Sequence, residues 1–171
     1  MIGDRWGVTD DETHQSYPCD RFVTDATLRA WRGVTIEAPP NVVWAWLIQV
    51  RLAPYSYDWI DNFGQRSPRV LLQLGDPDIG DPFSSSRGRP LGRVVALEHG
   101  EHLTARIMGA TMSYLLVPVG VARTRLILKV VGRPARLLAP MLAIGDLVMA
   151  RRQLLNFKKR AELSASLLSR P

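Results

Sequence analysis

Alternating apolar and polar positions predict β-strands in two parts of the chain. Residues 33–38 (GVTIEA) alternate, and the Pro39-Pro40 pair ends that strand. Short strands are also expected among the Gly, Pro and Asp residues of the middle. Four longer stretches then follow with only short turn-like links between them: 92–98, 101–108, 111–119 and 123–131. Consecutive strands with short links predict an antiparallel meander.

The last of these strands shows two distinct faces. Leu126, Leu128 and Val130 fall on one face, and Arg123, Arg125 and Lys129 fall on the other. Side chains alternate across a strand, so the apolar set is expected to face the core and the charged set to face solvent.

Helical spacing of apolar residues predicts three helices. Pro40 suits the first turn of a helix over 41–49, and a second short helix is expected over 55–63. The last segment is expected to be helical, with Pro134 able to open it and with a break or kink at Pro140 and Gly145, so that Asp146 caps the long stretch beyond. Its apolar stripe consists of Leu147, Ala150, Leu154, Phe157, Ala161 and Leu168.

This order of elements predicts an α+β fold in which a curved antiparallel sheet wraps around the long C-terminal helix. A helix held in a curved sheet leaves a cavity, which the two short helices would close. Residues 32–171 would form this domain. Residues 1–31 would form an N-terminal arm, in which Thr9 and Glu12 have the spacing of a capping box.

Length and composition agree with one ordinary folded domain. The 171 residues are 46% hydrophobic and 22% charged, and Cys19 is the only cysteine, so an internal disulfide is excluded. The N-terminus has no secretory signal pattern, and no apolar run approaches the ~20 residues of a membrane span. These features predict a cytoplasmic protein.

The net charge of +6 is unevenly distributed. Residues 1–31 carry six acids and three arginines, whereas residues 121–171 carry eleven basic residues and two acids. The basic end is typical of a solvated helix or of a helix that contacts an anionic membrane surface. It lacks the interleaved aromatic residues of a single-strand binder, so nucleic acid is not favoured as a partner.

Several phrases resemble one protein family in the same order along the chain. They are VTIEAPPNVVWAWLIQ (34–49), YSYDWIDN (55–62), GRVVALEHGEHL (92–103), RTRLILKV (123–130) and VMARRQLLNFKKRAE (148–162). The chain thereby resembles the polyketide cyclase/dehydratase-like (SRPBCC) members of the START-like, helix-grip superfamily. The resemblance implies an internal cavity for a hydrophobic or amphipathic molecule. The link RLAP, before YSYDW, is shorter than the glycine-rich loop of relatives, which implies an altered entrance.

No cofactor or metal is expected. His99 and His102 are three positions apart, but they lie at a turn with no other ligand nearby, and His14 and Cys19 have no evident partner. Phosphate-loop and dinucleotide fingerprints are absent from the sequence.

The aromatic cluster PYSYDWIDNF (54–63) supplies the candidate binding residues. Trp44 and Trp46 precede it, and helical geometry suggests that only one of these two faces the core. Asp58 and Asp61 share a side of the short helix, where they face solvent or cap it; alternatively, Asp58 lies at a pocket rim as an acid or base. The predicted ligand-binding residues are Tyr55, Tyr57, Asp58, Trp59, Arg106, Met108, Met112 and Tyr114.

Three functions follow from this sequence. The leading one is binding of a hydrophobic or amphipathic small molecule, such as a lipid or polyketide-like compound. The second is a cyclase- or dehydratase-type enzyme that uses Asp58, Tyr114 or Arg106 to move protons, so catalysis is left open. The third is a membrane-surface or protein-interaction module that acts through the basic C-terminal helix.

Overall fold

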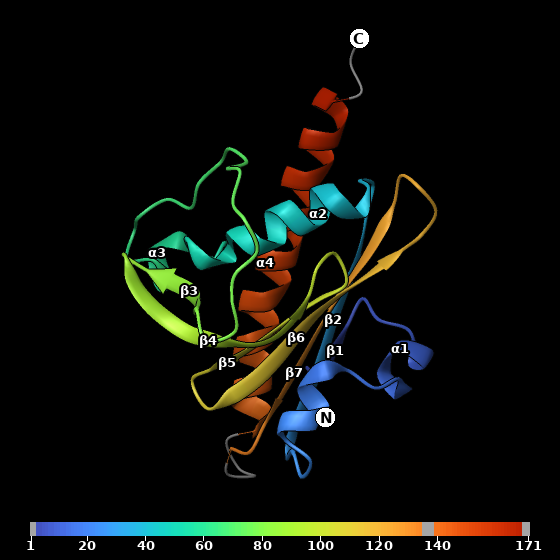
Figure 1. Cartoon of the computed structure of the whole chain (residues 1–171). Helices are drawn as coiled ribbons and strands as arrows, with labels where there is room; N and C mark the ends of the chain where they lie inside the picture. The colour runs from blue at the N-terminus through green and yellow to red at the C-terminus, as the bar shows by residue number, and fades with distance from the viewer. Residues whose placement is uncertain (1–2, 135–138, 169–171) are drawn as a thin grey trace.

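A curved sheet of seven strands holds the long C-terminal helix on one face (Figure 1). The computed structural model describes residues 3–134 and 139–168, without the side chains of residues 139–144 and 146. The order in the sheet is β1-β2-β7-β6-β5-β4-β3, and every neighbouring pair is antiparallel except β1 and β2. The strands are β1 (Arg5–Trp6), β2 (Leu28–Ile36), β3 (Pro82–Ser86), β4 (Arg89–Glu98), β5 (His102–Ile107), β6 (Ala110–Pro118) and β7 (Thr124–Gly132).

The helices complete the predicted order. They are α1 (Asp10–His14), α2 (Pro40–Leu47), α3 (Asp58–Asp61) and α4 (Ala139–Leu168), with 3-10 turns at Pro18–Phe22 and Ile48–Arg51. The predicted α+β, helix-grip architecture is confirmed. Of the helices that the structure describes, none combines the length and apolar character required to cross a membrane.

The inner face of the sheet packs against α4 as the two periodicities predict. Leu126 and Leu128 of β7 are fully buried in the same cluster as Leu154, Phe157 and Ala161 of α4. The predicted break at Pro140 and Gly145 is wrong, because α4 is one continuous helix from Ala139 to Leu168. Pro140 lies in its first turn, where the missing N–H costs nothing.

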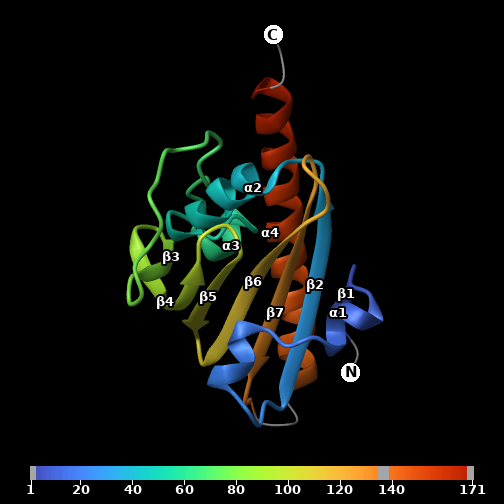
Figure 2. The ribbon, with the colours of Figure 1, turned by 45° about the vertical axis from the view of Figure 1, so that its right-hand side comes forward.

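Part of the outer face of the sheet, over β2 and β7, is covered by the N-terminal arm, here defined as residues 5–27 and including β1 (Figure 2). Tyr17 and Cys19 of the arm form a second buried cluster with Trp31, Ile127 and Val131 of β2 and β7. The predicted solvent face of β7 is therefore wrong for Lys129, which is only 5% exposed. The predicted boundary between residues 31 and 32 falls inside β2, since that strand begins at Leu28.

Candidate functional site

A long segment without strands joins the 3-10 turn at Ile48–Arg51 to β3 and contacts α4. We call residues 54–81 the covering segment. Its only helix is α3, and its remaining part, residues 62–81, is a connection of about 20 residues, longer than most loops in compact domains. Polar side chains of α4 donate to its backbone: Gln153 Nε2 to Pro54 O at 2.6 Å, Asn156 Nδ2 to Tyr55 O at 2.8 Å and Arg160 Nη1 to Pro68 O at 2.8 Å.

Tyr55 anchors the start of the covering segment in the core. Its side chain is fully buried, its hydroxyl oxygen accepts from Gln49 Nε2 at 2.8 Å, and its ring centroid lies 5.5 Å from that of Phe157. Burial raises the pKa of its phenol. The backbone has a φ of 57°, a left-handed conformation that a bulky residue rarely adopts. Such conformations persist where the surrounding contacts hold them, and they are concentrated at functional sites.

Tyr114 packs against α4 from the side of the sheet. We call the side chains that lie between the sheet, the covering segment and α4 the inner wall, or the wall. It lies on the inner face of β6, is 1% exposed and donates its hydroxyl to Gln153 Oε1 at 2.5 Å. Its ring stacks on Phe83 of β3 with the centroids 6.1 Å apart. Gln153 therefore links the sheet to the covering segment through a single α4 side chain.

Asp61 is the unusual group of this wall. Its Oδ2 accepts from the Ser56 hydroxyl, which also lies 4.0 Å from the Met149 sulfur of α4. Its Oδ1 is buried and has no hydrogen-bond partner among the described residues. Burial raises the pKa of the Asp61 carboxyl above its ordinary value. A buried carboxylate oxygen without a donor is rare in a folded protein, and the charged form is penalised accordingly.

Asp58, the carboxylate that the sequence suggested as an acid or base, has a structural task instead. Its Oδ1 accepts from Ser67 Oγ at 2.5 Å and its Oδ2 from the Ser67 backbone N–H at 3.0 Å. These bonds close the loop after α3. Of these two carboxylates, Asp61, three residues further along the chain, is the one whose pKa burial raises.

The aromatic cluster divides between core and surface. Tyr57 is partly buried, with the Arg152 guanidinium 5.7 Å from its ring centroid. Trp59 is 75% exposed and Phe63 is 72% exposed, so both rings extend from the outside of the covering segment.

Both tryptophans of α2 are buried, which corrects the expectation that only one faces the core. Trp44 Nε1 donates to Asp76 Oδ1 at 2.8 Å, and Trp46 Nε1 donates to Ser164 Oγ at 3.0 Å. Asp76 belongs to the covering segment, which buries one side of α2 while α4 buries the other.

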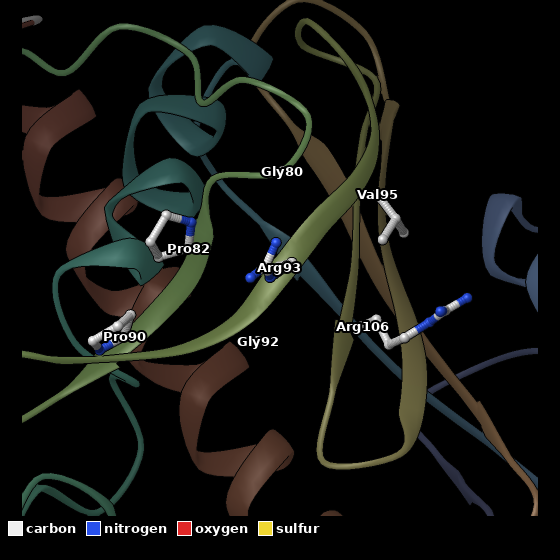
Figure 3. Close-up of a pocket in the computed structure, with 7 residues that line it drawn as sticks. All are labelled: Gly80, Pro82, Pro90, Gly92, Arg93, Val95 and Arg106. Carbon is white, nitrogen blue, oxygen red and sulfur yellow. The ribbon is translucent and has the colours of Figure 1, made fainter.

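Arg106 and Met108 do not join the inner wall. Arg106 is exposed on the outer face of β5, opposite to Tyr114 and its neighbours, and Met108 is 94% exposed in the turn after β5. Met112, in contrast, is partly buried against the inner core. Arg106 lines an open hollow of about 600 Å³ with Arg93, Pro82 and Pro90, and its side chain extends away from Arg93 (Figure 3).

His99, in the turn between β4 and β5, and His102, at the start of β5, have separate surroundings. His99 Nδ1 lies 2.6 Å from Asp76 Oδ2, and burial lowers the pKa of His102. Over residues 3–134 and 139–168, no group of three or more His, Cys, Asp or Glu side chains is placed to hold a metal ion.

Solved structures share this fold at low sequence identity. A protein of Nitrosomonas europaea has a TM-score of 0.54 and 14% identity, over 83% of this chain and 99% of its own. A protein of Nitrosospira multiformis has a TM-score of 0.52 and 12% identity, over 77% and 94%. A protein of Mesorhizobium loti is 17% identical over 84% and 99%, with a TM-score of 0.49. None of the three is described with an activity, and no family model or curated protein matches the chain.

Proposed function

We propose that this protein binds a small amphipathic molecule between the covering segment and α4. The observation that carries the proposal is the buried Asp61 oxygen that lacks a hydrogen-bond donor. A ligand hydroxyl or amine would supply that donor, and apolar parts of the ligand would contact Met149 and the rings of the wall. Binding then forms the hydrogen bond that Asp61 Oδ1 lacks in the protein alone.

Entry of the ligand requires the covering segment to move outward. The segment is held by side-chain hydrogen bonds to its backbone, and residues 62–81 contain neither helix nor strand. Loops of this length in compact domains are commonly binding loops or lids. The exposed rings of Trp59 and Phe63 would meet the ligand at the entrance, because Trp combines an apolar body with a polar N–H.

The resemblance to the SRPBCC family agrees with this assignment. It implies lipid or polyketide-like ligands for a helix-grip protein, and the phrases that carry it include residues 55–62 of the covering segment and residues 148–162 of α4. Fold alone does not determine function, so the ligand class rests on the wall beside Asp61.

A second candidate is a cyclase- or dehydratase-type enzyme that uses the same wall. The raised pKa of Asp61 favours it, because a carboxyl group with a raised pKa can hold a proton and return it nearer to neutral pH. Ser56, hydrogen-bonded to Asp61, would orient the carboxyl.

Membrane contact through the basic residues of α4 has less support, because most of these residues make internal contacts. Arg151 lies over Trp6 and Arg152 over Tyr57, while Lys158 Nζ pairs with Glu162 at 2.6 Å.

The test compares two probes that differ by one hydroxyl, naphthalene and 2-naphthol. We expect 2-naphthol to bind the protein roughly tenfold more tightly, since a hydrogen bond to a charged group is worth at least this factor. Asp61→Leu removes the acceptor and should abolish the advantage. Asp78→Leu is the matched control on the same segment, because the Asp78 side chain is exposed. Equal affinities for the two probes, or an advantage that survives in Asp61→Leu, would overturn the proposal.

A further inference from the structure

A second hollow lies on the opposite side of the sheet, between the N-terminal arm and the outer face. We call it the arm hollow. Its volume is about 450 Å³, and its walls are polar side chains of the arm together with Arg29, Trp31 and Lys129 from β2 and β7. It shares no lining residue with the covering segment or with the wall around Asp61.

The arm hollow has an excess of positive charge. Arg5, Arg29 and Lys129 line it, whereas Asp20 is its only carboxylate. Asp20 is already committed to Lys129, with 2.7 Å between Oδ1 and Nζ. Arg5 pairs with Asp10, but the Asp10 side chain is 86% exposed and lies outside the lining. Arg29 is exposed, and its side chain has no hydrogen bond or ion pair within residues 3–134 and 139–168, so its guanidinium is open to an anion from solvent.

Trp31 adds an unpaired donor to this wall. Its side chain is nearly buried, at 8% exposed, and its indole Nε1–H has no acceptor among the described residues. Indole nitrogen can only donate, and buried donors in native proteins almost always have a partner. The ring also has cations beside it, with Lys129 Nζ 5.1 Å and the Arg5 guanidinium 6.0 Å from its centroid. Its surroundings favour an acceptor of negative charge over a stacked aromatic ligand.

We propose that the arm hollow binds a small oxyanion, a phosphate or a carboxylate group. The anion pairs with Arg29 of β2 and with Arg5 of β1, and it reaches the buried Trp31 N–H as those side chains move to enclose it. Hydrogen bonds from guanidinium groups to oxyanions are among the strongest in proteins. A bound anion therefore joins the arm to the sheet, and its binding stabilises the covered state of the outer face.

The first experiment measures binding to the full-length protein by calorimetry, with inorganic phosphate, sodium acetate and sodium chloride at equal ionic strength. We expect saturable binding of at least one oxyanion and none of chloride. Binding of phosphate alone identifies a phosphate group as the ligand, binding of acetate alone identifies a carboxylate, and binding of both identifies an oxyanion site of either kind. Absence of saturable binding by both oxyanions would overturn the proposal.

The variants locate the site. Arg29→Gln should weaken the binding of the oxyanion roughly tenfold or more, since it removes a charge-assisted pair. It should also leave folding intact, because the Arg29 side chain makes no contact of this kind. Arg123→Gln is the matched control, an exposed arginine outside the arm hollow. An equal loss of affinity in both variants would show general electrostatic attraction and would exclude the site.

The second experiment follows the indole N–H signal of Trp31 by NMR, assigned from its absence in Trp31→Phe. Titration with the oxyanion should shift this signal downfield, as a new hydrogen bond to a negatively charged oxygen does. An unmoved Trp31 signal together with unchanged affinity in Arg29→Gln would place the anion elsewhere on the protein.

Discussion

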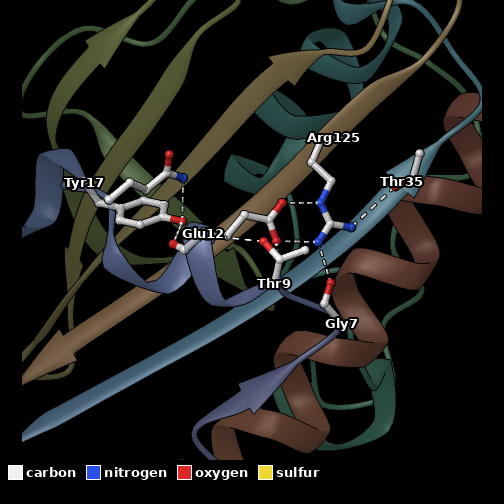
Figure 4. A network of polar contacts seen from close by, with 7 residues as sticks. Gly7, Thr9, Glu12, Tyr17, Thr35 and Arg125 are labelled. Atoms are coloured by element: carbon white, nitrogen blue, oxygen red, sulfur yellow. Dashed lines mark hydrogen bonds and ion pairs between the residues drawn. The ribbon is translucent and has the colours of Figure 1, made fainter.

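The two faces of the sheet bury carboxylates in opposite ways. On the outer face, Glu12 accepts from Arg125 Nε at 2.7 Å and from Arg125 Nη2 at 2.8 Å, and Arg125 also contacts Gly7 and Thr35 (Figure 4). The hydrogen bond from Arg125 holds the pKa of Glu12 below its ordinary value. On the inner side, the Asp61 carboxylate of α3 accepts from the Ser56 hydroxyl and has no cation paired with it among the described residues, and burial raises its pKa.

The difference separates a structural contact from a candidate site. Glu12 also receives the Thr9 backbone N–H at 2.8 Å in a capping box, so its charge is satisfied from several directions and serves to fix the arm. Asp61 retains an oxygen without a donor within the covering segment, which has left-handed residues at Tyr55 and Phe63. The outer carboxylate is held by a paired cation, whereas the inner one is the group on which the proposed binding depends.

The largest expected effect comes from the inner core on which the covering segment rests. Phe157 is fully buried and contacts Tyr55, so Phe157→Ala should lower the free energy of unfolding by about 3–5 kcal/mol. Urea denaturation measures this loss. Leu163→Ala, on an exposed position of the same helix, should change stability by less than about 0.5 kcal/mol. A loss below about 1 kcal/mol in Phe157→Ala would mean that the ring is not part of the core.

A smaller effect is expected from breaking the outer pair. Arg125→Met keeps the apolar stem but leaves Glu12 buried without its cation, which should cost about 2 kcal/mol. The arm should also open more often, and Cys19 reports this opening. Its thiol is fully buried, and burial raises its pKa to about 11, so it should resist alkylation in the native protein.

The rate of Cys19 alkylation at pH 8 therefore measures arm opening directly. Arg125→Met should raise the rate, and the exposed neighbour Arg123→Met should leave it unchanged. If alkylation is equally slow in both variants, the Glu12–Arg125 pair does not hold the arm in place.

The fold was readable from the sequence wherever one face of an element is consistently apolar. The meander and the packing of Leu154 and Phe157 follow from matching periods of two and 3.6. The charged face of β7 misled the prediction because its cations are buried by partners far away in sequence. Lys129 lies 109 residues from Asp20, and no local pattern announces such a pair. The break expected at Pro140 does not occur, because this proline lies in the first turn of α4, where a proline is harmless.

The candidate site was readable only in part. The cluster at residues 54–63 does lie against α4, but its division between core and surface depends on the covering segment, whose path no periodicity predicts. The choice between Asp58 and Asp61 depends on where Ser67 and Ser56 fall in the folded loop. One signal was available, since Gln153 and Asn156 interrupt the apolar stripe of α4 and proved to tether this segment.

The smallest expected effect is a pair of opposite pH dependences of stability. It compares the two carboxylates, Glu12 and Asp61, most directly. The folded pKa of Glu12 lies below its ordinary value of 4.5, so Glu12 contributes stability that is present above pH 4.5 and is lost as the pH falls through the folded pKa. The folded pKa of Asp61 lies above its ordinary value of 3.8. Its contribution is therefore present below pH 3.8 and is lost as the pH rises through the folded pKa.

Urea denaturation of the wild type, Glu12→Gln and Asp61→Asn between pH 3 and pH 7 checks both signs. The stability of the wild type relative to Glu12→Gln should increase with pH, and its stability relative to Asp61→Asn should decrease with pH. Each slope should stay below about 1.4 kcal/mol per pH unit, the limit for a single titrating group. Slopes rather than offsets decide the outcome, because each substitution also changes hydrogen bonds that do not titrate. If both slopes have the same sign, the two faces do not treat their carboxylates differently, and Asp61 loses its claim to a functional role.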